Sequence, residues 1–184
     1  MRLYSYVVKH DGGFAPNPFW GYCTLACCKP KIRESAEVGD WVVGTGSVLN
    51  IGQGKIIYAM KITEKLTFDQ YSDGDRFKCK IPITGGRKQE LGDNIYYKDK
   101  DGEWKQRKSL FHQSEKNKKR DLSSKNVLIS DHYFYADSKI VAIPKEFKSV
   151  VKKGPGHKCN FDASFIKDFI CWIENTLIVV NASN

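Results

Sequence analysis

Short apolar runs of strand length recur along this chain, separated by polar residues, glycine and proline. Valine, isoleucine, tyrosine and phenylalanine favour the extended backbone of a β-sheet, whereas glycine and proline interrupt it. None of the runs approaches the roughly 20 apolar residues that a membrane-spanning helix needs. The sequence therefore predicts strands at residues 3–8, 41–46, 56–62, 77–83, 126–129, 133–135, 140–143 and 177–180.

Three helices are expected among these strands. Pro30 favours the first turn of a short helix over residues 31–37, because its fixed φ suits that position. Pro144 begins a second short helix, which continues to Val151. Asp162 is a suitable N-cap for the last helix, whose apolar stripe at helical spacing would cover one face of a sheet. The stripe consists of Phe165, Ile166, Phe169, Ile170 and Ile173.

The order of these elements predicts an α/β fold of the α+β kind, formed by one domain over residues 1–184. A length of 184 residues is that of an ordinary domain and suffices for a hydrophobic core without disulfides. The start of the chain turns polar after Val8 and lacks the apolar segment of a signal peptide. We therefore expect a cytoplasmic protein with no membrane partner, whose six cysteines are reduced thiols.

The chain is basic, with 30 Lys and Arg against 21 Asp and Glu and a formal net charge of +9. Such a charge attracts polyanions, which favours nucleic acid as a partner. Much of it lies in residues 97–121, which we interpret as a basic insertion loop, although a solvated loop without a ligand fits this composition equally well. The side chains expected to contact phosphates are Lys29, Arg33, Lys116, Lys118, Lys119 and Arg120.

A loop rich in glycine, proline and aromatic residues follows the first strand and has the composition of a base-binding site. Bases are held by stacking on aromatic rings and are read through hydrogen bonds to polar groups. The ligand-binding residues that we expect are Asp11, Phe14, Asn17, Phe19 and Trp20 of this loop, with Thr45 and Ser47 at the end of the strand over 41–46. The alternative is structural, in that the prolines stiffen the loop and the aromatic rings cover the core.

Cys28 is a candidate nucleophile. It precedes Lys29 and the helix that begins at Pro30, and a neighbouring cation and a helix N-terminus both favour a reactive thiolate. His157 is the candidate base, although the two residues are far apart in the sequence. We give His112 little weight, because a lone histidine is more often a satisfied polar group than a base.

Zinc is a second hypothesis for the cysteines, because Cys23, Cys27, His157 and Cys159 could supply four ligands. Their spacing matches structural zinc sites only loosely, since those sites have two well-spaced pairs of ligands. The alternative is that Cys23 and Cys27 are small apolar residues of the core. We expect no cofactor, with zinc as the one exception.

Four motifs in a fixed order resemble a known family. DGGFAPNPF is followed by CTLACCKP, then by IR, and then by GDWVVGTGS. This order resembles the nucleotide modification associated domain, type two. The resemblance covers about the first 50 residues, is echoed by VLISDHYFY and by Gly156-His157, and leaves the basic segment outside. The family occurs beside DNA base-modifying enzymes of phages and bacteria, so the resemblance implies a role in base hypermodification.

The order of strand, polar loop, short helix, Gly39-Asp40 turn and apolar strand is also similar to the small barrels of the PUA, EVE and ASCH group. That resemblance implies a mixed, partly closed β-barrel with helices packed outside and a pocket for a nucleobase. The pocket would open between the loop over 11–20 and the strand end at Thr45 and Ser47.

Three functions follow from these observations and stay open at the level of sequence. The first is the binding or processing of modified bases in DNA, or of a nucleotide, through the loop over 11–20. The second is an enzyme of a base-hypermodification pathway that uses Cys28 or Asp11 together with His157. The third is a non-catalytic domain that binds a protein partner in the same pathway.

Overall fold

The structure, a computed structural model, describes residues 1–49, 51–136, 141–177 and 180–181. Its contacts divide the chain into two compact units. The first unit comprises Met1–Asp11, Ala36–Thr63 and Ser130–Asn184, and the second comprises Gly12–Ser35 and Glu64–Ile129. Each unit is built from segments that are separated in the sequence, so neither could be isolated as a continuous piece of chain.

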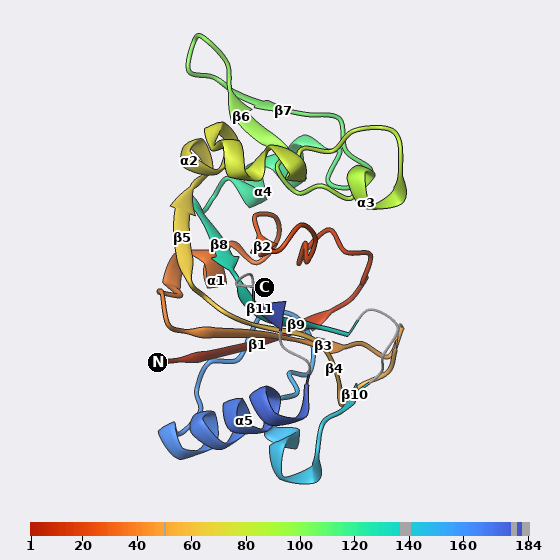
Figure 1. Ribbon diagram of the computed structural model, residues 1–184, viewed down its shortest axis with the longest axis vertical. Helices are drawn as coiled ribbons and strands as arrows, with labels where there is room; N and C mark the ends of the chain where they lie inside the picture. The colour runs from red at the N-terminus through yellow and green to blue at the C-terminus, as the bar shows by residue number, and fades with distance from the viewer. Residues whose placement is uncertain (50, 137–140, 178–179, 182–184) are drawn as a thin grey trace. The chain divides into compact units, whose positions relative to one another are not determined.

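The first unit contains a mixed β-sheet (Figure 1). Strand β1 (Leu3–Val8) runs parallel to β3 (Trp41–Gly46), and both match the predicted ranges residue for residue. Strand β4 (Lys55–Lys61) pairs antiparallel with β3 and lies one residue earlier in the chain than predicted. The parallel pair that the first half of the sequence forms thus stands at one end of the strand order.

The sheet continues with strands from the C-terminal part of the chain. Strand β9 (His132–Tyr135) pairs antiparallel with β4 and confirms the predicted strand at 133–135. Strand β10 (Val141–Ala142) pairs with the start of β4, and β11 (Val180–Asn181) pairs with β9. Parts of the predicted strands at 140–143 and 177–180 lie outside the described residues.

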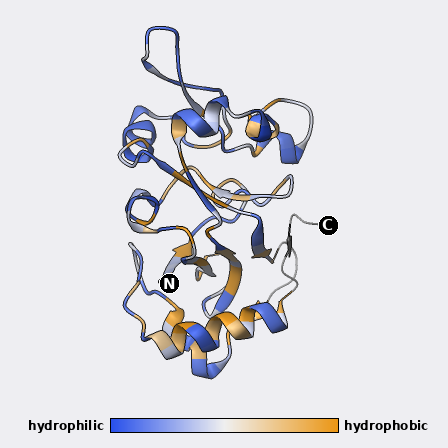
Figure 2. Ribbon diagram, turned by 60° about the vertical axis from the view of Figure 1, so that its left-hand side comes forward, coloured by the Kyte–Doolittle hydropathy of each residue, from blue (hydrophilic) through white to orange (hydrophobic). Residues whose placement is uncertain are grey.

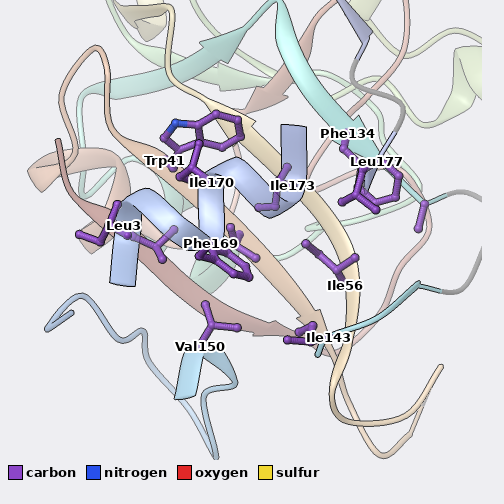
Figure 3. Packing of buried hydrophobic residues seen from close by; sticks show 14 residues of the cluster. Leu3, Trp41, Ile56, Phe134, Ile143, Val150, Phe169, Ile170, Ile173 and Leu177 are labelled. Atoms are coloured by element: carbon purple, nitrogen blue, oxygen red, sulfur yellow. The ribbon is translucent and has the colours of Figure 1, made fainter. Parts of the chain in front are cut away.

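Helix α5 (Ala163–Thr176) completes the hydrophobic core of the first unit. Figure 3 shows Phe169, Ile170 and Ile173 of this helix facing side chains of the strands. Figure 2 shows hydrophobic and hydrophilic residues alternating along the helix, as its predicted apolar stripe requires. Asp162 is the N-cap residue, as predicted, although its side chain makes no capping hydrogen bond.

The second unit contains a small sheet in which β8 (Asn126–Ser130) lies between β2 (Cys23–Leu25) and β5 (Glu64–Thr67). Strands β6 (Tyr96–Lys98) and β7 (Trp104–Gln106) form an antiparallel hairpin. The helices of this unit are α1 (Pro30–Ser35), α2 (Phe68–Asp73), α3 (Arg87–Glu90) and α4 (Glu115–Asp121). The helix that was predicted to begin at Pro30 is therefore confirmed, and so is the strand at 126–129.

The predicted strand at 77–83 is wrong, because the chain forms a 3-10 helix there, η1 (Asp75–Lys80). Residues three apart face the same side of such a helix, and this buries both Phe77 and Lys80. The ring of Phe77 packs 4.7 Å from that of Tyr71. The predicted helix after Pro144 is also of the 3-10 type, η2 (Lys145–Val150).

The expected barrel is not confirmed. Among the described residues, the large sheet is open, since β1 and β11 stand at opposite ends of its strand order. The two other sheets are separate from it and contain three and two strands. The described residues therefore establish a mixed α+β fold with several sheets, and the single domain over 1–184 stays a prediction.

The basic segment 97–121 is more ordered than an insertion loop. It contains the end of β6, all of β7 and all of α4. Ion pairs stabilise the hairpin, with Lys98 at 2.8 Å from Asp69 and Lys105 at 3.2 Å from Asp99. Part of the basic charge is therefore compensated locally. In the part of the chain that the structure describes, no helix is long and apolar enough to cross a membrane.

Replacing Phe169 by alanine should destabilise the first unit, because its side chain is fully buried between α5 and the sheet. The loss of buried apolar surface and the resulting cavity predict a decrease of about 3–5 kcal/mol in the free energy of unfolding. Chemical denaturation followed by tryptophan fluorescence measures it. Lys167→Ala on the exposed face of the same helix is the control and should change stability by less than about 0.5 kcal/mol.

Candidate functional site

A cysteine, a histidine and an aspartate meet in the second unit. The Cys28 sulfur lies 3.3 Å from Nε2 of His112. The other ring nitrogen of His112, Nδ1, is hydrogen-bonded to a carboxylate oxygen of Asp121. Cys28 is partly exposed, whereas the His112 side chain is 14% exposed and that of Asp121 is fully buried. A buried carboxylate thus orients an imidazole toward the thiol of a partly exposed cysteine.

Asp121 positions the backbone of Cys28 in addition to the ring of His112. Its Oδ1 accepts a hydrogen bond of 3.0 Å from the backbone N–H of Cys28. Its Oδ2 accepts one of 3.0 Å from the hydroxyl of Tyr96, in addition to the contact with His112. Asp121 is the last residue of α4, so one helix end holds the nucleophile candidate and its base candidate together.

Arg33 supports the same arrangement from inside the protein. Its side chain is fully buried and donates hydrogen bonds to the backbone carbonyls of Cys28 at 2.9 Å and of Asn126 at 2.6 Å. It donates a third hydrogen bond to the carbonyl of Asp121. Because these carbonyls occupy its donors, Arg33 connects the start of α1, the end of α4 and β8. The sequence suggested a phosphate contact for this residue, but the structure places it in the interior.

The backbone of the site adopts conformations that side chains normally avoid. Among the described residues, four that are not glycine have positive φ, and three of them are Cys28 (64°), Lys29 (42°) and His112 (54°). Each such residue costs about 1–3 kcal/mol, and these conformations concentrate at functional sites. The hydrogen bonds from Arg33 and to Asp121 hold Cys28 in this conformation.

Electrostatics favour a protonated imidazole next to an ionised carboxylate. Burial alone would lower the pKa of His112, but its hydrogen bonds to Asp121 and Cys28 outweigh burial and raise the pKa to about 9. Burial likewise opposes ionisation of Asp121, yet the contact with His112 and the N–H of Cys28 bring its pKa below the usual value. A protonated imidazole thus lies 3.3 Å from the Cys28 sulfur.

The same residues could also hold a metal ion, because ligand atoms of Cys27, His112 and Asp121 lie within 4.8 Å of one another. Two observations favour proton transfer over metal binding. Both oxygens of Asp121 already accept hydrogen bonds, and the thiol of Cys27 is fully buried. Burial raises the pKa of this thiol well above its usual value, which disfavours the thiolate that a metal requires.

The loop that was expected to bind a base is held by a buried lysine. The Nζ of Lys80 donates hydrogen bonds to the side-chain oxygen of Asn17 at 2.7 Å and to the carbonyls of Asn17, Phe19 and Tyr22. The amide nitrogen of Asn17 donates to the carbonyls of Gly13 and Leu91, both at 2.9 Å. The fully buried Asn17 therefore uses its polar atoms within the protein.

Burial lowers the pKa of Lys80 and raises that of the nearby Asp93, and the opposite charge of each residue counteracts the shift of the other. Asp93 also accepts hydrogen bonds from Tyr71 at 2.6 Å and from Thr24 at 2.7 Å. This second buried network lies in the same unit as the Cys28 cluster and fixes the path of the loop.

The aromatic residues of the loop divide into two groups. Phe14 is buried, stacks at 4.8 Å on Phe111 and meets the ring of His112 edge-on at 5.1 Å, so it helps to orient the histidine. Phe19 and Trp20 are partly exposed and meet edge to face at 5.6 Å. The Nζ of Lys88 lies 5.6 Å from the ring of Phe19. Only this second group presents rings to solvent.

The remaining residues of the predicted pocket lie in the first unit. Asp11 accepts a hydrogen bond of 2.7 Å from Tyr135. Thr45 is fully buried and donates to the carbonyl of Tyr6 at 3.3 Å, and Ser47 donates to the carbonyl of Lys9 at 3.5 Å. These contacts give each of the three residues a structural role within the first unit.

The other cysteine and histidine candidates are placed as follows. Cys23 and Cys27 are buried in the second unit, as the core interpretation expected. His157 belongs to the first unit, where its ring lies 5.8 Å from that of Tyr4, and the exposed Cys159 follows two residues later. The residue that contacts the Cys28 thiol is His112, which the sequence analysis set aside.

The residues expected to contact phosphates lie on α1, in the turn before it and on α4. Lys116 and Lys119 are exposed on α4, and Lys118 lies 3.9 Å from Glu115 on the same helix. Lys29 directly follows the cysteine of the cluster. Arg120 is 48% exposed, and its Nη2 lies 3.3 Å from Nε2 of His112. The basic segment thus places a cation against the histidine.

A cavity of about 220 Å³ lies beside the loop that carries His112. It is lined by Pro82, Ile83, Thr84, Glu90, Lys108, Ser109, Leu110 and Gln113. The loop is closed on itself, because Gln113 donates to the carbonyl of Ser109 at 3.0 Å and Gln106 donates to that of His112 at 2.7 Å. A second cavity of about 320 Å³ includes Trp104, Lys98 and Lys125.

These features define a mixed α+β protein with a Cys–His–Asp cluster on a basic unit. The chain belongs to the family described as nucleotide modification associated domain 2, whose sequence profile matches residues 1–182. The match confirms the resemblance of the N-terminal motifs and extends it across the basic segment. No curated protein and no solved structure matches the chain. The family associates the protein with nucleotide modification.

The charge of His112 should make the stability of the protein depend on pH in the alkaline range. The pKa of about 9 exceeds the ordinary value of 6.5, so protonated His112 stabilises the folded state. This contribution is complete below about pH 6.5 and is lost as the pH rises through about 9. Free energies of unfolding of the wild type and of His112→Gln, measured from about pH 6 to about pH 10, should therefore converge. A difference that stays constant would mean that folding does not raise the pKa of His112.

Proposed function

We propose that this protein is a thiol-dependent enzyme of nucleotide modification, with Cys28 as the nucleophile, His112 as the base and Asp121 as the residue that positions the base. The observation that carries this proposal is the continuous contact from the sulfur of the partly exposed Cys28 through both ring nitrogens of His112 to a buried carboxylate. The same order of groups activates nucleophiles in enzymes of unrelated folds.

The reaction class that fits these groups best is acyl transfer. His112 accepts the thiol proton, and the Cys28 sulfur bonds to a carbonyl carbon of the substrate. Collapse of the resulting adduct breaks the bond to the leaving group, which takes the proton from His112, and leaves a thioester on Cys28. Water or an amine then attacks the thioester, with His112 again as the base, and restores the free thiol.

The substrate of this enzyme is a nucleotide or a base within nucleic acid, as the family and the basic charge favour. Phe19 and Trp20 are the partly exposed rings of the loop on which a base could stack. A reader of modified bases is less well supported, because the polar atoms of Asn17 are bonded within the protein.

The test is the rate at which iodoacetamide alkylates each cysteine at about pH 6, measured by mass spectrometry of peptides. Ordinary thiols are almost wholly protonated there, so Cys28 should react on the order of tenfold faster than the exposed Cys159 and Cys171. His112→Gln should remove this advantage, because it removes the group that holds the thiol proton. Cys28→Ser should abolish turnover of acylated nucleotides and leave the fold intact.

His132→Gln is the matched control. His132 also contacts a carboxylate, that of Glu174 at 3.1 Å, but it belongs to the first unit. This variant should leave the alkylation of Cys28 unchanged. If Cys28 reacts no faster than Cys171, or if His112→Gln leaves its rate unaltered, the proposal of covalent catalysis is wrong.

A further inference from the structure

The cluster around Cys28 contains one group that the proposed proton transfer does not use. Arg120 directs its guanidinium at the cluster, with Nη2 at 3.3 Å from Nε2 of His112 and Nε at 3.5 Å from Oδ1 of Asp121. The Cys28 sulfur lies at the same 3.3 Å from Nε2 of His112. Arg120 and the sulfur are therefore separated by at most twice that distance.

The contact between Arg120 and His112 satisfies neither group once His112 carries a proton on Nε2. Arginine only donates hydrogen bonds, and a protonated imidazole also only donates them. When His112 holds the thiol proton, its Nε2–H points to the sulfur, and Nη2 of Arg120 needs another acceptor. Because the side chain of Arg120 is 48% exposed, that acceptor can come from a ligand.

The charges of the cluster point in the same direction. Arg33, Arg120 and protonated His112 carry three positive charges, whereas Asp121 carries one negative charge and the thiolate of the proposed mechanism adds a second. Arg33 is buried and directed to backbone carbonyls, so it is not accessible to a ligand. The cluster therefore carries an excess of positive charge, and Arg120, which shares Asp121 with His112, is its partly exposed cation.

The usual stabiliser of negative charge at a cysteine nucleophile is also occupied here. In many such sites, the backbone N–H of the nucleophile itself donates to the developing oxyanion. The N–H of Cys28 donates instead to Oδ1 of Asp121 at 3.0 Å. The side chain of Arg120 is a cationic donor that contacts the same ring nitrogen of His112 as the sulfur does.

We propose that Arg120 binds an anionic group of the substrate beside the Cys28 sulfur, and that this group is a phosphate of a nucleotide. The planar guanidinium forms paired hydrogen bonds to phosphate oxygens, which a lysine does not. This inference rests on the proposed function for the identity of the nucleophile. It adds a requirement on the substrate, whose phosphate must lie within reach of the reacting sulfur.

Two alkylating reagents of nearly equal size test this inference on the intact protein. Iodoacetate carries a negative charge and iodoacetamide does not, and both transfer a carbon to the thiolate with loss of iodide. The ratio of their rates at Cys28, divided by the ratio at Cys159 and Cys171, reports anion binding at the thiol. We expect this normalised ratio to be roughly 5, because the anion is attracted to Arg120.

Variants of α4 assign the effect to one side chain. Arg120→Gln should bring the normalised ratio back to about 1, whereas Arg120→Lys should retain part of it because the charge remains. Lys100→Gln is the matched control, because it removes one exposed charge from the same unit at a position outside α4. It should leave the ratio unchanged. A high ratio that persists in Arg120→Gln would overturn the assignment to Arg120.

Competition identifies the anion. Inorganic phosphate and a nucleoside 5′-monophosphate should both slow the reaction of iodoacetate with Cys28, the latter at lower concentration, and the nucleoside without phosphate should not. Protection by the nucleoside alone would overturn the phosphate assignment. An oligonucleotide that protects better than the mononucleotide would place the phosphate in nucleic acid.

The two proposals fail in different ways. Fast, His112-dependent alkylation of Cys28 by iodoacetamide without any preference for iodoacetate would leave covalent catalysis in place and overturn only the phosphate site. Slow alkylation of Cys28 by both reagents would instead contradict the proposed function.

Discussion

The second unit depends on the burial of one carboxylate. Transferring an ionised carboxyl group out of water is costly unless hydrogen bonds and opposite charge compensate for it. Asp121 receives this compensation from the N–H of Cys28, the hydroxyl of Tyr96 and the ring of His112. These partners come from the turn before α1, from β6 and from the loop before α4. Because each partner lies in a different segment, the burial of the ionised carboxylate is fully compensated only when all three segments are in place. The hydrogen bonds that form the site are therefore also hydrogen bonds that stabilise the fold of this unit.

The cost of the site is visible in its backbone. Positive φ at Cys28, Lys29 and His112 opposes folding, so favourable contacts elsewhere must offset this strain. Arg33 supplies part of it by donating to the carbonyls of Cys28, Asn126 and Asp121. Lys80 does the same for the neighbouring loop, where it donates to Asn17, Phe19 and Tyr22. Two buried cations that saturate backbone carbonyls thus hold irregular chain in fixed positions. Such preorganisation lets a nucleophile and its base meet the substrate without rearranging.

Periodic elements were predictable from the sequence, whereas the partners of the site were not. Strands β1 and β3 and helix α5 follow from local patterns of apolar residues, so their bounds in the sequence can be predicted without knowledge of distant contacts. The segment 77–83 has a similar pattern, but burial of Phe77 and Lys80 on one side of a 3-10 helix overrides it. The environment of Cys28 marked it as a candidate, yet its contact His112 lies 84 residues away. No local spacing connects the two residues, because the members of such a cluster are adjacent only in space. The same holds for Asn17. Its amide suits the reading of a base, but Lys80, which is 63 residues away, donates a hydrogen bond to its side-chain oxygen.

The basic segment shows why charge in a sequence has more than one meaning. The many charged residues of 97–121 suggested a surface that attracts polyanions. Among so many charges, nothing in the sequence distinguishes the two residues that complete the cluster. Asp121 and Arg120 are neighbours at the end of α4, but the carboxylate is fully buried and the guanidinium is about half exposed. One turns inward to the imidazole and the other lies at the surface next to it, so a shift of this helix end moves both. Binding of an anion at Arg120 and the orientation of His112 by Asp121 are therefore mechanically linked. A segment that sequence alone describes as an insertion carries, in the structure, both Asp121 and Arg120, through which we propose that substrate charge is coupled to the thiol.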